Sequence, residues 1–177
     1  LSKHAFAGYS NYDWRCYGTP YVHTSGLYHG VHATGPYNGE WVQVDLSENY
    51  ITSSYVLQGY PSNHQPYNNS SPKKGYLLSS LDNKTWRLVH TFDETTDNAD
   101  YTYSDVSGNG VRINNITNNK NAIGRYWRFV VEKVFSSNSS YVNITQFKID
   151  GVKYPSEVNV GNGAETTTIK NYTLTET

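Results

Sequence analysis

The chain has 177 residues, a formal net charge of −1 and only 16% charged residues, which fits a single domain. It lacks the basic stripe that nucleic-acid binding requires and any run of about 20 apolar residues that could span a membrane. Seventeen tyrosines and the complete absence of methionine favour strands over long helices.

The first clear strand signal begins at residue 40. In residues 40–46, Val42, Val44 and Leu46 occupy alternate positions and form one apolar face. A second strand is predicted over residues 51–58. Each of these segments is long enough to bury one face of a sheet.

A β-hairpin is predicted in the middle of the chain. Residues 76–80 and 86–92 have strand-like composition, and residues 81–84 between them are LDNK. Polar Asp-Asn between two apolar segments is typical of a tight turn between antiparallel strands.

Two further strands are predicted toward the C-terminal end, over residues 126–134 and 142–150. Alternation predicts which of their side chains face the core. We expect Trp127, Phe129 and Val131 to point inward from the first strand and Phe147 and Ile149 from the second, which Gly151 is expected to end.

The predicted fold class is all-β, an antiparallel β-sandwich or jelly roll. No segment longer than two turns has a helical period, and seven or eight short strands joined by loops are typical of such sandwiches. We expect the domain to cover residues 1–154. Residues 155–177 are rich in Thr and Asn and are predicted to form a linker or an extended arm.

Five motifs follow one another along the chain: residues 39–46 (GEWVQVDL), Ile51 with residues 58–59 (QG), residues 81–86 (LDNKTW), residues 124–129 (GRYWRF) and residues 147–151 (FKIDG). In this order they resemble the discoidin (coagulation factor 5/8 type C) family. The resemblance covers roughly residues 5–152 and implies a galactose-binding-like sandwich, which the family shares with many carbohydrate-binding modules. Residues 126–129 and 139–144 look like variants on surface proteins of large DNA viruses and phage tails.

The resemblance also implies where a ligand binds, because the family uses loops at one end of the sandwich. Residues 11–23, 35–39 and 60–67 match these loops. Aromatic rings stack on the C–H faces of sugars, and Arg, Asn and His bind their hydroxyls. The alternative is that the tyrosines brace the loops. The expected ligand-binding residues are Trp14, Arg15, Tyr17, Tyr21, His23, Tyr37, Tyr60, Asn63, His64 and Tyr67.

The four tryptophans are expected to divide into two groups. Trp41, Trp86 and Trp127 lie inside strand motifs and are expected to be core or sheet-packing residues. Trp14 is the tryptophan expected to be exposed.

No cofactor is predicted, and calcium is the alternative. Many family members bind calcium through an acidic loop before the first core strand and a Glu in the final strand. No such loop precedes Trp41, and the final strand offers Gln146 instead. The acidic residues Asp93, Glu94, Asp97 and Asp100 are expected to form a solvated turn, with a cation site as the alternative. His29 and His32 have ligand-like spacing, but a loop does not bring both imidazoles to one face, so no zinc site is expected.

No catalytic motif is found, so we expect a binding protein and not an enzyme. The first hypothesis is a carbohydrate-binding adhesion module, extracellular or on a virion surface, with a glycan or glycoprotein as its partner. The second is a structural capsid or fibre component whose loops and tail contact other subunits. Neither nucleic acid nor membrane insertion is expected. Seven Asn-x-Ser/Thr sequons favour an exposed protein: Asn68, Asn69, Asn83, Asn115, Asn138, Asn143 and Asn171.

Overall fold

The computed structural model describes residues 2–7, 14–15, 20–22, 24–58, 70–93, 111–116, 119–135, 141–155, 157–161 and 166–170. Every element in these ranges is a strand, which confirms the all-β prediction. The strands are β1 (Ser2–Ala7), β2 (Trp14–Arg15), β3 (Ala33–Thr34), β4 (Tyr37–Asn38), β5 (Glu40–Gln58), β6 (Pro72–Ser80), β7 (Arg87–Asp93), β8 (Val111–Asn115), β9 (Ile123–Val134), β10 (Asn143–Ile144), β11 (Gln146–Lys153), β12 (Glu157–Gly161) and β13 (Thr166–Lys170). No helix able to cross a bilayer occurs in these ranges.

The main sheet is antiparallel and is organised around the long strand β5. Its order is β1-β11-β5-β9-β6-β7, and β8 also pairs with β5. The first part of β5 pairs with β9, whereas residues 54–58 pair with β11 and β8. The two strands predicted over 40–46 and 51–58 are therefore one continuous strand. Its register shifts between Asp45 and Tyr50, and Ser47 has a φ of 64°.

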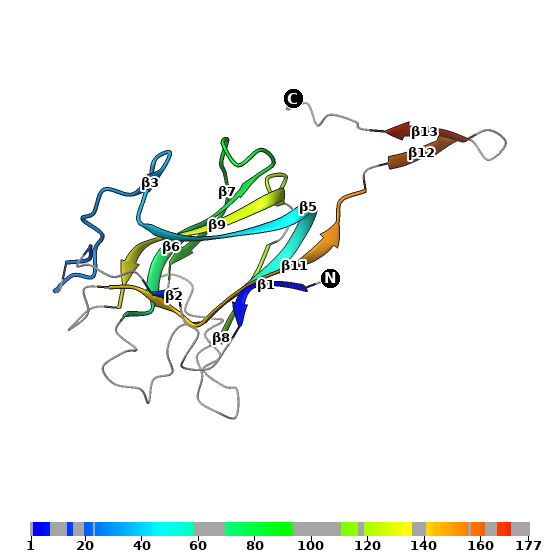
Figure 1. Ribbon diagram of the computed structural model, residues 1–177. Coiled ribbons are helices and arrows are strands. Elements are labelled where there is room, and N and C mark those ends of the chain that lie inside the picture. Colours follow the sequence, from blue (N-terminus) through cyan, green and yellow to red (C-terminus); the bar gives the residue numbers. More distant parts are fainter. Residues whose placement is uncertain are drawn as a thin grey trace.

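This shared strand turns the sheet into the two layers of a sandwich. The first part of β5 lies with β9, β6 and β7, and the second part lies with β11, β1 and β8. Figure 1 shows the chain turning back between the two parts. Side chains from both layers meet: the ring of Phe129 lies 6.1 Å from that of Tyr55 and 6.1 Å from that of Phe147. The predicted β-sandwich is confirmed.

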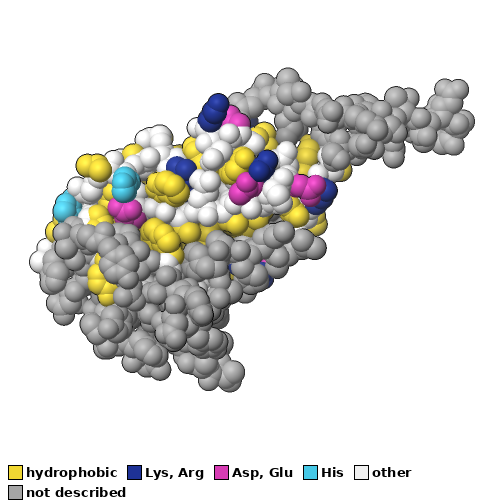
Figure 2. All heavy atoms as spheres, in the orientation of Figure 1, with side chains coloured by type: hydrophobic (Ala, Val, Ile, Leu, Met, Phe, Trp, Pro, Cys, Tyr) yellow, Lys and Arg dark blue, Asp and Glu magenta, His cyan; other side chains and the backbone are white. Residues whose placement is uncertain are grey.

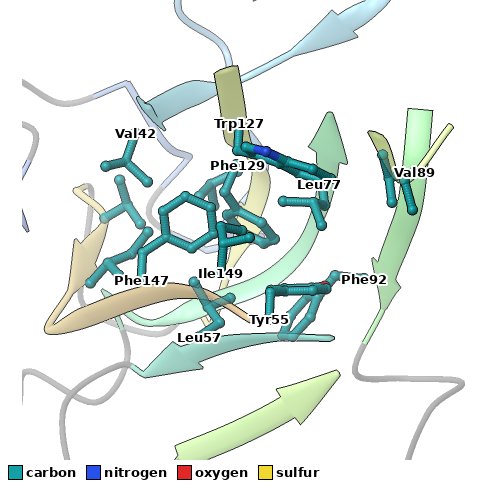
Figure 3. Packing of buried hydrophobic residues seen from close by; sticks show 14 of the residues in the cluster. Val42, Tyr55, Leu57, Leu77, Val89, Phe92, Trp127, Phe129, Phe147 and Ile149 are labelled. Atoms are coloured by element: carbon teal, nitrogen blue, oxygen red, sulfur yellow. The ribbon is translucent and has the colours of Figure 1, made fainter. Parts of the chain in front are cut away.

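The core contains the side chains that alternation placed inward. Trp127, Phe129, Val131, Phe147 and Ile149 are all buried, as predicted. Figure 3 shows most of them packed together with side chains of β5, β6 and β7. The indole N–H of Trp127 donates to the carbonyl of Gly124 at 3.0 Å, so this buried polar group is satisfied.

The predicted hairpin forms from β6 and β7, and Asp82 organises its turn. The Asp82 Oδ1 accepts from the backbone N–H groups of Lys84 and Thr85, both at 2.8 Å. The hydroxyl of Ser80 donates to the same oxygen at 2.9 Å. These donors, the Thr85 N–H first, favour the charged carboxylate and hold the pKa of Asp82 well below its ordinary range.

We expect the contribution of this turn to the stability of the fold to depend on pH. Because the pKa of Asp82 is lower in the folded chain, the carboxylate stabilises the fold fully above its ordinary pKa of 3.8. The stabilisation declines as pH falls from there toward the folded-state value. Melting temperatures at pH 6 and pH 2 should therefore show a larger deficit for Asp82→Ala at pH 6. As a control, the difference in melting temperature between Asp82→Asn and Asp82→Ala should not change with pH. If the melting temperature of the wild type exceeds that of Asp82→Ala by the same amount at both pH values, the stabilising role of the Asp82 carboxylate is contradicted.

The prediction that Gly151 ends the last core strand is wrong. Strand β11 continues to Lys153, and its pairing with β5 shifts between Asp150 and Gly151. A Cβ at position 151 would lie 2.1 Å from the carbonyl oxygen of Ile51. Glycine therefore permits a bulge with close backbone approach, and the strand runs on.

Residues 155–177, predicted as a linker or arm, contain a two-stranded hairpin. Strands β12 and β13 pair from Glu157 opposite Lys170 to Gly161 opposite Thr166. They form a sheet of their own, separate from the main sheet. Figure 1 shows this hairpin extending away from the sandwich.

Candidate functional site

Three of the ten expected ligand-binding residues have described side chains: Trp14, Tyr21 and Tyr37. For Arg15 the structure describes only its place in β2. The others lie outside the described residues, and their expected roles stay predictions: Tyr17, His23, Tyr60, Asn63, His64 and Tyr67.

Trp14 lies against the core. Strand β2 pairs with β10, so that Trp14 stands opposite the fully buried Ile144. The indole is partly buried and packs on the hydrophobic core. The expectation of an exposed Trp14 is therefore wrong, because the short β2–β10 pairing draws the ring onto the sandwich.

Tyr21 has the bracing role that was the alternative for the tyrosines. It is 1% exposed, and its hydroxyl donates to the carbonyl of Val131 at 3.0 Å. Its ring contacts Tyr28 edge-on, with centroids 5.3 Å apart. This ring has almost no surface to offer a ligand, which corrects the expectation of a binding role. It fastens the segment before β3 to β9.

Tyr37 lies in β4 and is partly buried. The turn before it contains Gly35, whose φ of 58° suits glycine. The ring of Tyr37 packs on that of Tyr76, with centroids 4.7 Å apart and planes tilted by 45°. Its cross-strand partner Thr34 is buried and contacts Arg128, so Tyr37 lies on the side of the β3–β4 hairpin that faces the sheet, with part of its side chain accessible.

Glu132 holds the Tyr76 ring of this pair in place. The Tyr76 hydroxyl donates to one oxygen of Glu132, and the Lys74 ammonium donates to the other at 2.9 Å. Burial, with help from the bond to Glu132, raises the pKa of Tyr76, so the phenol stays protonated. The bond to Glu132 also raises the pKa of Lys74. The Tyr76 side chain, on which Tyr37 packs, is therefore held in place.

A second cluster of polar groups surrounds Glu40, directly after β4. The His32 Nδ1–H donates to both Glu40 carboxylate oxygens at 3.0 Å, and the Tyr28 hydroxyl donates to Oε1 at 3.2 Å. The Tyr28 hydroxyl also accepts from the backbone N–H of His32 at 2.8 Å. The His32 side chain is 59% exposed, so much of its ring is open to solvent.

We call Tyr28, His32, Tyr37, Glu40 and Tyr76 the β4 corner. The Gly39 N–H donates to the carbonyl of His32 at 3.1 Å, and this bond joins the two ends of the β3–β4 segment. Figure 2 shows histidine, acidic and hydrophobic side chains together on the part of the surface near β3. An imidazole, a carboxylate and an aromatic ring can bind a polyhydroxylated ligand with an apolar face.

Sequence reasoning missed a second surface group. Trp127 is buried as expected, but Trp41 is 37% exposed on the outer face of the sheet. The Arg128 guanidinium lies over the Trp41 ring at 3.8 Å and over the Trp86 ring at 4.1 Å. The sequence did indicate this position of Trp41, because alternation that places Val42 and Val44 inward places Trp41 on the outer face. Such contacts are each worth about 0.5–2 kcal/mol.

Of the candidate cation ligands, the structure describes Asp93, His29 and His32. Of the acidic residues 93–100 only Asp93 is described, and it ends β7 opposite Lys74. His29 and His32 are both exposed, and His32 contacts Glu40. In the part of the chain that the structure describes, no group of three or more His, Cys, Asp and Glu side chains could hold a metal ion.

Comparison with known proteins gives one family match. The profile of the F5/8 type C domain matches residues 16–147. None of the curated proteins matches the chain.

Three solved structures illustrate the structural likeness. The module CBM32-1 from a family 31 glycoside hydrolase of Clostridium perfringens has 15% identity and a TM-score of 0.47, covering 84% of this chain and 92% of its own. The family 32 carbohydrate-binding module of Streptococcus pneumoniae EndoD has 15% identity and a TM-score of 0.45, covering 63% and 68%. A Clostridium perfringens CBM32-5 module in complex with GalNAc-β-1,3-galactose has 13% identity and a TM-score of 0.43, covering 65% and 69%.

Proposed function

Because the chain belongs to the F5/8 type C domain family, we propose that it is a non-catalytic carbohydrate-binding module that acts in adhesion. Its place of action would be outside a cell, on a cell surface, a phage appendage or a virion. The sequons at exposed Asn83 and Asn115 support such a location. Family membership does not favour the alternative of a structural capsid or fibre component.

The β4 corner is the observation that carries the proposal. It combines the Tyr37 ring with the His32 imidazole and the Glu40 carboxylate on one short segment. A sugar needs both an apolar surface for its C–H face and fixed polar groups for its hydroxyls. The Tyr76 ring supports Tyr37, and Tyr28 supports Glu40, so little conformational entropy is lost on binding.

The aromatic loops would form the second part of the binding surface. Residues 11–23 and 60–67 would extend the binding surface, with Tyr60, His64 and Tyr67 as further contacts. The affinity of one module would be modest, so attachment would depend on several copies binding together. A Tyr60→Ala, His64→Ala double variant tests this part separately from the β4 corner.

We expect His32→Ala and Tyr37→Ala each to weaken glycan binding about tenfold, because a lost hydrogen-bonding or stacking partner costs about 1–2 kcal/mol. A glycan array identifies the ligand, and calorimetric titration of the wild type and variants gives the dissociation constants. Lys120→Ala is the matched surface control, since Lys120 is exposed in the turn before β9. The control should bind as the wild type does.

Two results would count against the proposal. A folded domain that binds no glycan on a broad array would remove the carbohydrate function. Glycan binding that survives both His32→Ala and Tyr37→Ala unchanged would keep the function but remove the β4 corner as its site.

A further inference from the structure

A half-buried arginine lies between two tryptophans on the outer face of the sheet. Arg128 of β9 stands opposite Gln43 of β5. Its guanidinium carbon is 3.8 Å from the ring centroid of Trp41 and 4.1 Å from that of Trp86. We call these three residues the Trp41–Arg128–Trp86 stack. None of them belongs to the β4 corner.

Neutral oxygens hold the guanidinium in this position. The Gln43 Oε1 accepts from Nε at 3.1 Å and from Nη2 at 2.7 Å, and the Thr34 hydroxyl oxygen accepts from Nη1 at 2.7 Å. An arginine has five N–H donors. Within the described part of the chain, the remaining two, one on Nη1 and one on Nη2, donate to no group. Among the described residues, the group is thus fixed in place by three of its donors, and two donors have no acceptor.

The charge of Arg128 is also uncompensated within the described residues. Its partners Gln43 and Thr34 are neutral, and burial lowers its pKa. Arg125, three positions earlier, behaves differently: it pairs with both oxygens of Asp45, at 2.7 and 2.8 Å. A partly dehydrated cation that lacks a carboxylate attracts an anion more strongly than a solvated one does.

We propose that the Trp41–Arg128–Trp86 stack is a second binding site, for the acidic group of an anionic saccharide. The carboxylate or sulfate oxygens would accept the two remaining N–H groups of Arg128, since a guanidinium suits planar or forked oxyanions. The exposed part of Trp41 would contact the sugar ring. The choice of a saccharide rests on the proposed function, whereas the choice of an oxyanion rests on Arg128 alone.

The test uses the full chain and the indole N–H signals of its four tryptophans in ¹H–¹⁵N spectra. Glucuronate, galactose 6-sulfate and neutral galactose are titrated at matched ionic strength, and Trp→Phe variants assign the signals. Both acidic probes, or one of them, should shift the Trp41 and Trp86 signals with saturation in the millimolar range. Galactose should bind there at least tenfold more weakly. The stronger of the two acidic probes identifies a carboxylate or a sulfate as the preferred group.

Variants separate binding from a structural role of Arg128. Arg128→Gln should abolish the response to the acidic probes, and Arg128→Lys should weaken it about tenfold, because lysine keeps the charge but loses the fork. Arg125→Gln is the matched control and should respond as the wild type does. If Arg128→Gln does not fold, the wild-type titration and the Arg128→Lys variant still decide the question.

The proposal is overturned if neither acidic probe shifts the Trp41 and Trp86 signals, or if folded Arg128→Gln binds them as the wild type does. A failed glycan array with a positive acidic response would remove the β4 corner and keep this site. If the array is positive and the Trp41 and Trp86 signals do not shift, the β4 corner is kept and this second site is removed.

Discussion

Replacing Phe129 with alanine is expected to destabilise the domain by about 3–5 kcal/mol, the range for large aromatic deletions in a core. Phe129 is fully buried, and its ring contacts the rings of Tyr55, Phe92 and Phe147 at centroid distances of 6.1, 5.8 and 6.1 Å. These partners come from three strands of both layers. Deletion would therefore leave a cavity at the junction of the sandwich. Urea unfolding followed by circular dichroism measures the loss.

Val152→Ala is the control for this experiment. Val152 is also apolar and also on a strand, but it is 63% exposed. Its replacement should change the free energy of unfolding by no more than about 0.5 kcal/mol. A Phe129→Ala variant that loses less than about 1 kcal/mol would show that the two layers do not meet at this ring.

Replacing Gly39 with alanine is expected to cost about 1–3 kcal/mol and to disturb the β4 corner. A Cβ at this position would lie 2.2 Å from the carbonyl oxygen of Val131 and 2.9 Å from a methyl carbon of Val130. Because backbone atoms cannot move aside cheaply, β4 would shift away from β9. That shift would separate Tyr37 from Tyr76 and move Glu40. Thermal unfolding and glycan titration measure the two effects.

Gly35→Asn is the matched glycine control. No atom lies within 4 Å of a Cβ at this position, although its φ is 58°. Asparagine tolerates this left-handed conformation better than other residues with a side chain. Stability and glycan binding of this variant should stay close to those of the wild type. Equal losses at both positions would mean that the hairpin conformation, and not the contact of Gly39 with β9, supports the corner.

The buried faces of the strands could be predicted from the sequence. Alternation placed Val42 and Leu46 inside, together with Phe129 and Ile149, and all four are buried. The Asp-Asn turn also indicated the β6–β7 hairpin correctly. Both signals are local, because side chains two residues apart share a face and a tight turn pairs adjacent segments.

The candidate site could be predicted only in part. Tyr37 was expected to bind a ligand; it is partly buried and packs on Tyr76, and its binding role stays a prediction. Tyr21 and Trp14 were also expected to bind a ligand, but a hydrogen bond to Val131 holds Tyr21, and pairing with β10 draws Trp14, toward the sandwich. Composition cannot distinguish a tyrosine that braces a loop from one that meets a ligand, because both uses need a ring with a polar end.

The sequence by itself determined that this protein is an all-β sandwich and which side chains fill its interior. Only the tertiary structure decided that residues 40–58 form one strand shared by both layers. It also decided that Arg128 lies between Trp41 and Trp86. The physical reason is that strand alternation is a property of neighbouring residues, whereas the register between strands depends on segments far apart in the chain.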